Sequence, residues 1–331
     1  MNLTDYHAKY FAYELTKRCS SDNIEKLAGA VASAQVDLNP HQVDAALFAF
    51  KSPLAKGALL ADEVGLSKTI EAGLVLSQKW AERKRRILVI TPANLRKQWH
   101  QELTEKFFLP CRILESRSYN EVVNAGNLRP LEPTDAIVIC SFQFARTKAA
   151  EVARTAWDLV VVDEAHRLRN VYKPSNVIAN TLKQALAGKN TLLLTATPLQ
   201  NSLLELFGLV NFIDEHTFGD LQSFREQFAN LSQEQVFRTL KARLKPICQR
   251  TLRRQVTSYI PFTKRLPILE EFTPEESEDR LYNLVSEYLS RSNLQALPAG
   301  QRSLITLVLR KLLASSTFAI AGALETISRR L

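Results

Sequence analysis

The chain has 331 residues, 46% of them hydrophobic, and carries 43 Lys and Arg against 34 Asp and Glu, a net charge of +9. This length exceeds one typical domain, so we expect one large α/β domain with an appended helical part, and the basic balance favours polyanionic partners. Four widely separated cysteines argue against a disulfide framework or Cys metal site; the absence of a signal peptide and of any run of about 18 apolar residues predicts a cytoplasmic protein with no membrane contact.

Two helices are predicted first. Residues 3–34 have helical apolar spacing, broken by the polar run at 20–23, and the simplest interpretation is a lid on the main domain. The stretch Leu38-Asn39-Pro40-His41-Gln42 follows. By itself, Gln42 is an ordinary polar residue on a helix.

A short apolar strand then leads into the stretch 62–69, which ends in Ser-Lys-Thr before a helical pattern, the layout of a phosphate-binding loop. Lys68 would reach the β and γ phosphates and the Thr69 hydroxyl would sit on Mg²⁺. Serine at position 67 departs from the usual glycine and is expected to need a backbone angle that costs a non-glycine residue roughly 1–3 kcal/mol. The predicted nucleotide-binding residues of this loop are Asp62, Glu63, Val64, Gly65, Leu66, Ser67, Lys68 and Thr69.

Apolar strand patterns at 86–90, 136–140, 158–162 and 191–194 alternate with helical stretches. This alternation predicts a parallel sheet covered by helices on both faces, with ligands bound at the carboxyl ends of its strands. Two adjacent acids, Asp163 and Glu164, close the third of these strands, where isolated carboxylates are costly unless they have work to do. We expect Asp163 to hold Mg²⁺ through water and Glu164 to orient and deprotonate an attacking water.

The last hundred residues divide into a basic segment and a helical region. The stretch 241–265 has eight Lys and Arg and no acid, so it is either a solvated face or a surface that meets DNA or an acidic patch. Residues 275–331 have helical apolar spacing, and the apolar arc of the final helix is wide enough to predict packing against something outside the chain. The basic residues are Lys241, Arg243, Lys245, Arg250, Arg253, Arg254, Lys264 and Arg265.

The motifs, taken in order, resemble the first RecA-like lobe of the Swi/Snf-family ATPases of helicase superfamily two. The resemblance rests on Leu-x-Pro-His-Gln, Asp-Glu-Val-Gly-Leu-x-Lys-Thr, Thr-Pro-x-x-Leu-x-x-Gln-Trp, Asp-Glu-Ala-His-Arg-Leu-Arg-Asn and Thr-Ala-Thr-Pro-Leu-Gln-Asn, and it covers about residues 36–265. The loop wording is most similar to bacterial members, such as the RNA-polymerase-recycling ATPase and helicases of phage-defence systems. Asp62 is normal for this family, whereas Ser67 departs from it too.

The resemblance implies a role for several further residues. It implies that Gln42 contacts adenine through its amide, and that His166, Thr195 and Thr197 couple the nucleotide site to a nucleic-acid groove. It also implies that Thr91, Pro92, Gln98 and Ser141 contact the DNA backbone. For Thr91 and Ser141 an interpretation as simple helix caps stays open, as does a plain turn for residues 195–198.

The family implies ATP- and Mg²⁺-dependent translocation on double-stranded DNA. We expect N-terminal helices at 1–35, the RecA-like lobe at 36–235, and a basic segment with a helical protrusion at 236–331 that leads toward a second RecA-like lobe. Because that lobe supplies an arginine worth roughly 10³–10⁵ in rate, the chain by itself is expected to hydrolyse little ATP. RNA polymerase and defence-system proteins are candidate partners. The alternatives are a strand-separating helicase of the Asp-Glu-Ala-His class and a degenerate DNA-binding or partner-binding module.

Overall fold

The computed structural model describes residues 4–9, 34–50, 56–228, 234–263, 266–269, 273–291 and 302–329. The chain folds as two compact units, Met1–Phe262 and Thr263–Leu331, which we describe separately. The predicted N-terminal helices lie largely outside the described residues, which show a helical stretch at 5–9 there. Lys264 and Arg265 of the basic segment lie outside them too.

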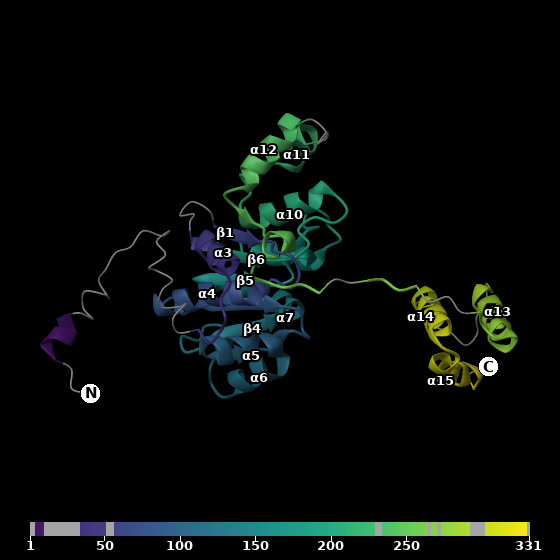
Figure 1. The fold of residues 1–331 in the computed structure, drawn as a ribbon. Coiled ribbons are helices and arrows are strands. Elements are labelled where there is room, and N and C mark those ends of the chain that lie inside the picture. The colour runs from purple at the N-terminus through teal and green to yellow at the C-terminus, as the bar shows by residue number, and fades with distance from the viewer. Residues whose placement is uncertain are drawn as a thin grey trace. The chain divides into compact units, whose positions relative to one another are not determined.

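A parallel sheet forms the centre of the first unit, with the strand order β3-β4-β2-β5-β6-β1-β7 (Figure 1). The predicted α/β fold with a parallel sheet is confirmed. Two short edge strands were not predicted, and one of them, β7, pairs with β1 although about 190 residues separate them. The strands are β1 (Gly57–Leu60), β2 (Ile87–Thr91), β3 (Cys111–Ile113), β4 (Ile137–Ser141), β5 (Leu159–Val162), β6 (Thr191–Leu194) and β7 (Cys248–Gln249).

Helices cover both faces of this sheet, because successive strand residues point to opposite sides. Leu60 and Val161 pack on the side of α3, α4 and α5, whereas Leu59 and Val160 pack on the side of α7 to α10. The helices are α3 (Pro40–Phe50), α4 (Lys68–Ala81), α5 (Arg96–Phe107), α6 (Ser116–Asn124), α7 (Phe142–Thr147), α8 (Ala149–Arg154), α9 (Val177–Ala185), α10 (Leu203–Ile213), α11 (Leu221–Gln227) and α12 (Glu234–Leu244), with 3₁₀ turns η1 (Ala165–Leu168) and η2 (Arg253–Gln255).

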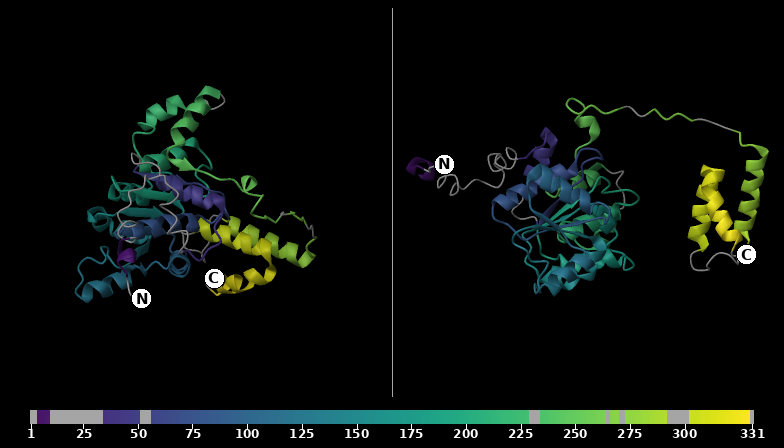
Figure 2. Two further views of the ribbon diagram at one scale, coloured as in Figure 1. Left: turned by 60° about the vertical axis from the view of Figure 1, so that its left-hand side comes forward. Right: turned by 90° about the horizontal axis from the view of Figure 1, so that it is seen from below.

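The second unit holds three helices, α13 (Glu276–Ser290), α14 (Arg302–Ser315) and α15 (Thr317–Ser328), at the yellow-green end of the colour scale (Figure 2). A small core joins them through Val285 on α13, Leu309 on α14 and Ile320 on α15. On the predicted wide apolar arc of the final helix, Ile320 is fully buried, whereas Phe318 is 91% exposed. Among the described residues, no helix is both long and apolar enough to cross a membrane.

Candidate active site

Two polar motifs meet at the carboxyl edge of the sheet. The loop 61–67 follows β1 and the Asp163-Glu164 pair follows β5, and both strands pair in parallel with β6, which lies between them. The pKa of Glu164 is lowered chiefly by a hydrogen bond from His166, and the charge of Lys68 lowers it further. The charge of Lys68 therefore acts on Glu164 across this edge of the sheet.

The phosphate loop has the strained serine that the sequence predicted. Ser67 is the N-cap of α4 with φ 61° and ψ 56°, in the left-handed region that glycine adopts freely. Gly65, at φ 86°, is a second left-handed position in the same loop. The Lys68 Nζ donates to the Asp62 carbonyl at 2.9 Å, and the half-buried Thr69 lies in the first turn of α4. The amino group is thus folded over the loop, where backbone N–H groups at a helix start attract anions.

Helix α3 holds this loop from one side. Gln42 is 3% exposed, and its Nε2 donates to the Leu66 carbonyl at 3.4 Å while its Oε1 accepts from the Asn39 N–H at 3.0 Å. His41 also contacts the Leu66 carbonyl, with 3.2 Å to Nε2. In this structure the Gln42 amide therefore makes its hydrogen bonds to Leu66 of the loop and to Asn39. The adenine contact stays a prediction.

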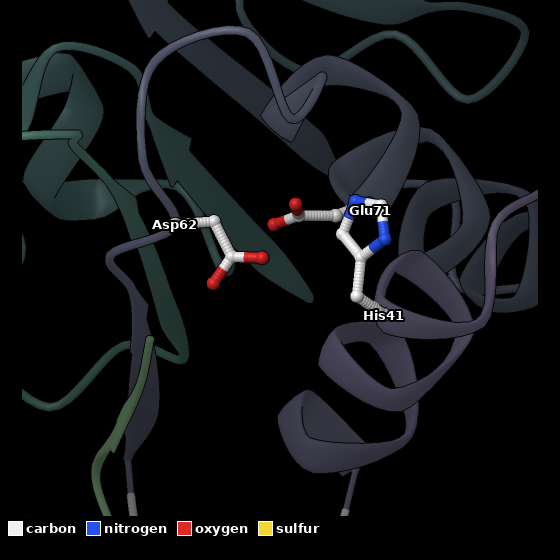
Figure 3. Close-up of side chains that lie close together, drawn as sticks. All are labelled: His41, Asp62 and Glu71. Carbon is white, nitrogen blue, oxygen red and sulfur yellow. The ribbon is translucent and has the colours of Figure 1, made fainter. Parts of the chain in front are cut away.

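Behind the loop lies a buried polar cluster of His41, Asp62 and Glu71, whose ligand-type atoms fall within 4.8 Å of one another. Figure 3 shows the carboxyl groups of Asp62 and Glu71 pointing toward one another. Among the residues that the structure describes, both Glu71 oxygens and Asp62 Oδ2 lack a hydrogen-bond partner. The pKa of Glu71 is raised to about 9, by burial and then by the Asp62 charge. The His41 nitrogens already face the Leu66 carbonyl and, at 3.3 Å, the Tyr259 hydroxyl. Glu71 is therefore protonated at neutral pH, and the cluster does not offer three free ligands to a metal ion.

Three hydrogen-bond donors hold Asp163 of the acidic motif in place. Asp163 Oδ2 accepts from the Thr91 hydroxyl at 3.0 Å and from the Trp99 indole at 2.8 Å, and Oδ1 accepts from the Glu164 N–H at 2.8 Å. Burial raises the pKa of Asp163, and the two side-chain donors oppose that rise. Glu164 has φ 49°, a second strained non-glycine residue at the site, and its Oε2 lies 3.0 Å from His166 Nδ1.

Several predicted contact residues make hydrogen bonds within the chain. Thr91 is fully buried and its hydroxyl donates to Asp163; the N-cap of the following helix α5 is Leu95, and the DNA contact of Thr91 stays a prediction. The Thr195 hydroxyl accepts from the Thr197 N–H at 3.2 Å, and the coupling role of His166, Thr195 and Thr197 stays a prediction. Ser141 caps α7 by accepting from the Phe144 N–H at 3.2 Å, and Pro92 is buried. Gln98 is exposed and donates to Glu102 at 2.9 Å.

The segment 250–253, which follows β7 and which we call the strap, lies along the phosphate loop, and no pattern in the sequence predicts this contact. The chain continues from β7 so that the Glu63 N–H donates to the Thr251 carbonyl at 3.0 Å, and the Thr251 N–H donates to Asp62 Oδ1 at 2.6 Å. In the sequence, these residues belong to the basic segment 241–265. Nor does any pattern in the sequence predict the ion pair between Arg169 and Glu205, whose charged atoms lie 3.3 Å apart. Next to it, a Cβ on residue 208 would lie 1.9 Å from the Arg169 carbonyl oxygen, so only glycine fits there.

Comparisons with known proteins agree with this arrangement. An uncharacterized ATP-dependent helicase, YqhH of Bacillus subtilis (strain 168), is 37% identical over 193 residues, which cover 57% of this chain and 32% of that protein. The RNA polymerase-associated protein RapA of Pectobacterium atrosepticum is 37% identical over 201 residues, covering 59% of this chain and 20% of RapA. The chain thus aligns with a third or less of the length of these relatives.

The fold is also that of a solved structure, the Sulfolobus solfataricus SWI2/SNF2 ATPase core in complex with dsDNA. The TM-score is 0.58 at 21% identity, over 88% of this chain and 61% of that one. The SNF2-related domain family matches residues 16–320, which is most of the sequence. With the phosphate loop and the acidic pair on one sheet edge, the chain therefore belongs to the SNF2-related domain family.

Proposed function

We propose that this chain is the ATP-binding RecA-like lobe of a Swi/Snf-type translocase that moves on double-stranded DNA. The observation that supports the proposal is that, at the carboxyl edge of the sheet, the loop before Lys68 and the Asp163-Glu164 pair follow β1 and β5, two parallel strands that flank β6, and that the Lys68 charge acts on Glu164. Nucleotides bind at this edge in open α/β sheets. The family membership and the name of the relative YqhH support ATP as that nucleotide.

The residues present fit Mg²⁺ and a triphosphate. The N-terminus of α4 and the Lys68 amino group supply positive charge for phosphates, and a hydroxyl on Thr69 with a carboxylate on Asp163 supplies the oxygen donors that Mg²⁺ prefers. When bound, Mg²⁺ would neutralise charge on the phosphates. Asp163 is held ready by its three donors, and Glu164, whose pKa is lowered, is ionised and able to accept a proton from water.

The DNA and the second lobe belong to the same proposal. The solved structure with this fold is bound to dsDNA, the relative RapA is named for its association with RNA polymerase, and the chain carries a net charge of +9. We infer that double-stranded DNA lies across the exposed polar residues near Gln98, and that a second RecA-like lobe completes the site with its arginine. RNA polymerase is the protein partner that we would test first; defence-system proteins come next.

Titration of the full chain with Mg·ATP, without DNA, tests the nucleotide site. We expect Lys68→Ala to weaken ATP binding at least about tenfold, because a charge-assisted contact to phosphate is worth more than about 1.4 kcal/mol. Glu164→Gln should bind ATP normally, since its role begins with the attacking water. Lys79→Ala is the matched control, because Lys79 lies at the far end of α4 and pairs with Glu82. Equal binding by the Lys68→Ala variant and the wild type would refute the proposal.

The strained Ser67 favours one other function, a degenerate module that binds DNA or a partner without hydrolysis. Joining the chain to a second RecA-like lobe separates the two. The translocase proposal requires DNA-stimulated hydrolysis by that two-lobe protein and its loss in Glu164→Gln. DNA binding with no hydrolysis in either protein would support the degenerate module.

A further inference from the structure

The strap that follows β7 ends on an arginine at the tip of the phosphate loop. Leu59, Ala61 and Glu63 donate their N–H groups to the carbonyls of Ile247, Gln249 and Thr251 at 2.8, 2.8 and 3.0 Å. This alternation is a parallel ladder that continues beyond the two residues of β7 into the loop. The ladder places Arg253 beside residues 63–65.

Arg253 makes two hydrogen bonds with the loop, and its guanidinium lies close to Gly65. Its N–H donates to Glu63 Oε2 at 2.7 Å, and its Nε donates to the Val64 carbonyl at 2.7 Å. One terminal nitrogen lies 3.0 Å from the position that a Cβ on Gly65 would occupy. Among the described residues, the guanidinium has no acidic ion-pair partner; its carbon lies 5.2 Å from the centre of the Phe262 ring. The charge of Arg253 is therefore directed at the loop.

The Val64 contact decides which way the next N–H points. A trans peptide is planar, with its C=O and N–H on opposite sides. Since the Val64 carbonyl faces Arg253, the Gly65 N–H faces away from it. In the same way His41 and Gln42 hold the Leu66 carbonyl, so the Ser67 N–H faces away from α3. Side chains outside the loop thus grip alternate carbonyls and turn alternate N–H groups toward the inside.

We propose that Arg253 is a positioning residue of the nucleotide site: it fixes the Val64–Gly65 peptide so that the Gly65 N–H is presented to a bound phosphate. This inference rests on the proposed function, because it names a further residue that the same site needs. It also assigns one member of the basic run to nucleotide binding instead of DNA. Arg253 touches the loop, and we assign it no contact with the nucleotide.

The test uses the full chain and three variants, Arg253→Ala, Arg253→Lys and Arg254→Ala, in Mg·ATP titrations without DNA. Arg254 is the matched control, since it is the adjacent residue and carries the same charge, but is exposed where Arg253 is half-buried. We expect Arg253→Ala to weaken ATP binding about tenfold, because the loop must then be ordered when nucleotide binds, and Arg254→Ala to change it less than about twofold. Arg253→Lys keeps the charge but not the Nε donor and should recover only part of the affinity. Equal weakening by both alanine variants would overturn the proposal in favour of general electrostatics.

Hydrogen exchange of the loop amides, measured without nucleotide, separates this inference from the proposed function. Exchange of the stretch 61–68 should be faster in Arg253→Ala than in the wild type, and unchanged in Arg254→Ala. If the wild type binds no ATP but this exchange difference is found, the proposed function fails and the positioning of the loop stands. If the loop exchanges at the wild-type rate in Arg253→Ala, or in Arg253→Lys should the alanine variant not fold, the inference is wrong.

Discussion

Two pairs of acids, Asp163 with Glu164 and Asp62 with Glu71, lie near the carboxyl edge of the sheet, and they differ in the number of hydrogen-bond donors that surround them. Asp163, next to Glu164, has three hydrogen-bond donors. Within the described parts of the chain, Asp62 has one donor, on Oδ1, and neither its other oxygen nor the two oxygens of Glu71 has one. Pairs of buried carboxyls without donors cannot both ionise, whereas a carboxylate with several donors can.

The difference matches the two roles that we propose, chemistry for Asp163 and Glu164 and shaping of the loop for Asp62 and Glu71. The donors of Asp163 oppose the rise in its pKa that burial causes, and so favour the negative charge that a cation site would need. The pair Asp62 and Glu71 keeps a proton instead, and joins the start of the phosphate loop to helix α4. Three substitutions test this contrast.

The largest effect is expected at Glu71. In the folded chain Glu71 keeps its proton up to pH about 9, whereas the unfolded chain loses it near pH 4.5. Between these values the unfolded state binds fewer protons, so this group makes the free energy of unfolding fall as pH rises, by at most about 1.4 kcal/mol per pH unit. Glu71→Gln removes this slope. The stability of the variant relative to the wild type should therefore rise by about 3 kcal/mol from pH 6 to pH 8 in urea unfolding.

Glu205→Gln is the control for this measurement. The pKa of Glu205 is lowered in the folded chain despite its burial, by hydrogen bonds from Asn201 and Gln200 and the charge of Arg169. Glu205 is thus ionised in both states above pH 6, and its replacement should shift stability equally at pH 6 and pH 8. A pH-independent difference for Glu71→Gln would show that Glu71 is ionised in the fold.

A smaller effect is expected from Thr91→Val, which keeps the shape of a fully buried side chain and removes its hydroxyl. Asp163 then loses one donor, and the free energy of unfolding should fall by about 2 kcal/mol, the usual worth of a hydrogen bond to a charged group. Thr155→Val is the comparison, since that buried hydroxyl donates to the neutral Glu151 carbonyl at 2.9 Å and should cost about 1 kcal/mol. Equal losses in thermal or urea unfolding would contradict a charged Asp163.

The smallest effect is expected from Ser67→Gly, which relieves a left-handed backbone. Stability should rise by about 1 kcal/mol, and ATP affinity about fivefold, if the strain opposes nucleotide binding. Arg83→Gly is matched, because Arg83 has φ 62°, is exposed and lies at the other end of α4. It should gain the same stability and no affinity in calorimetric titration. An affinity gain in both variants would mean that the overall stability of the chain, and not the conformation of the loop, determines its affinity for nucleotide.

Much of this site could be predicted because strong local patterns placed it. Apolar runs marked β1, β2, β4, β5 and β6, and the phosphate loop and acidic pair follow two of them directly. The edge strands β3 and β7 span three and two residues and are only half-buried, so they leave no apolar run to detect. The left-handed angle of Ser67 was predictable too, because its position demands it.

The contacts that finish the site were not predictable, because they join distant parts of the chain. A hydroxyl at the end of a strand, such as Thr91, has the same sequence pattern whether it caps a helix, meets DNA or binds Asp163, and only the fold selects the last. Arg253 was one of eight basic residues, and nothing local distinguishes it from Arg254. Its hydrogen bond to Glu63 spans 190 positions of the sequence.

That span also bears on how the protein is made. The strands from β1 to β6 have left the ribosome's catalytic centre once Leu194 is added, but the outer wall of the phosphate loop is absent until Arg253 is added, about 60 residues later. At translation rates of roughly 5–20 residues per second, several seconds pass between the synthesis of β6 and the synthesis of the residues that hold the phosphate loop. If Arg253 positions the loop as we propose, nucleotide binding by the nascent chain is expected to reach full strength only after this segment has been synthesised.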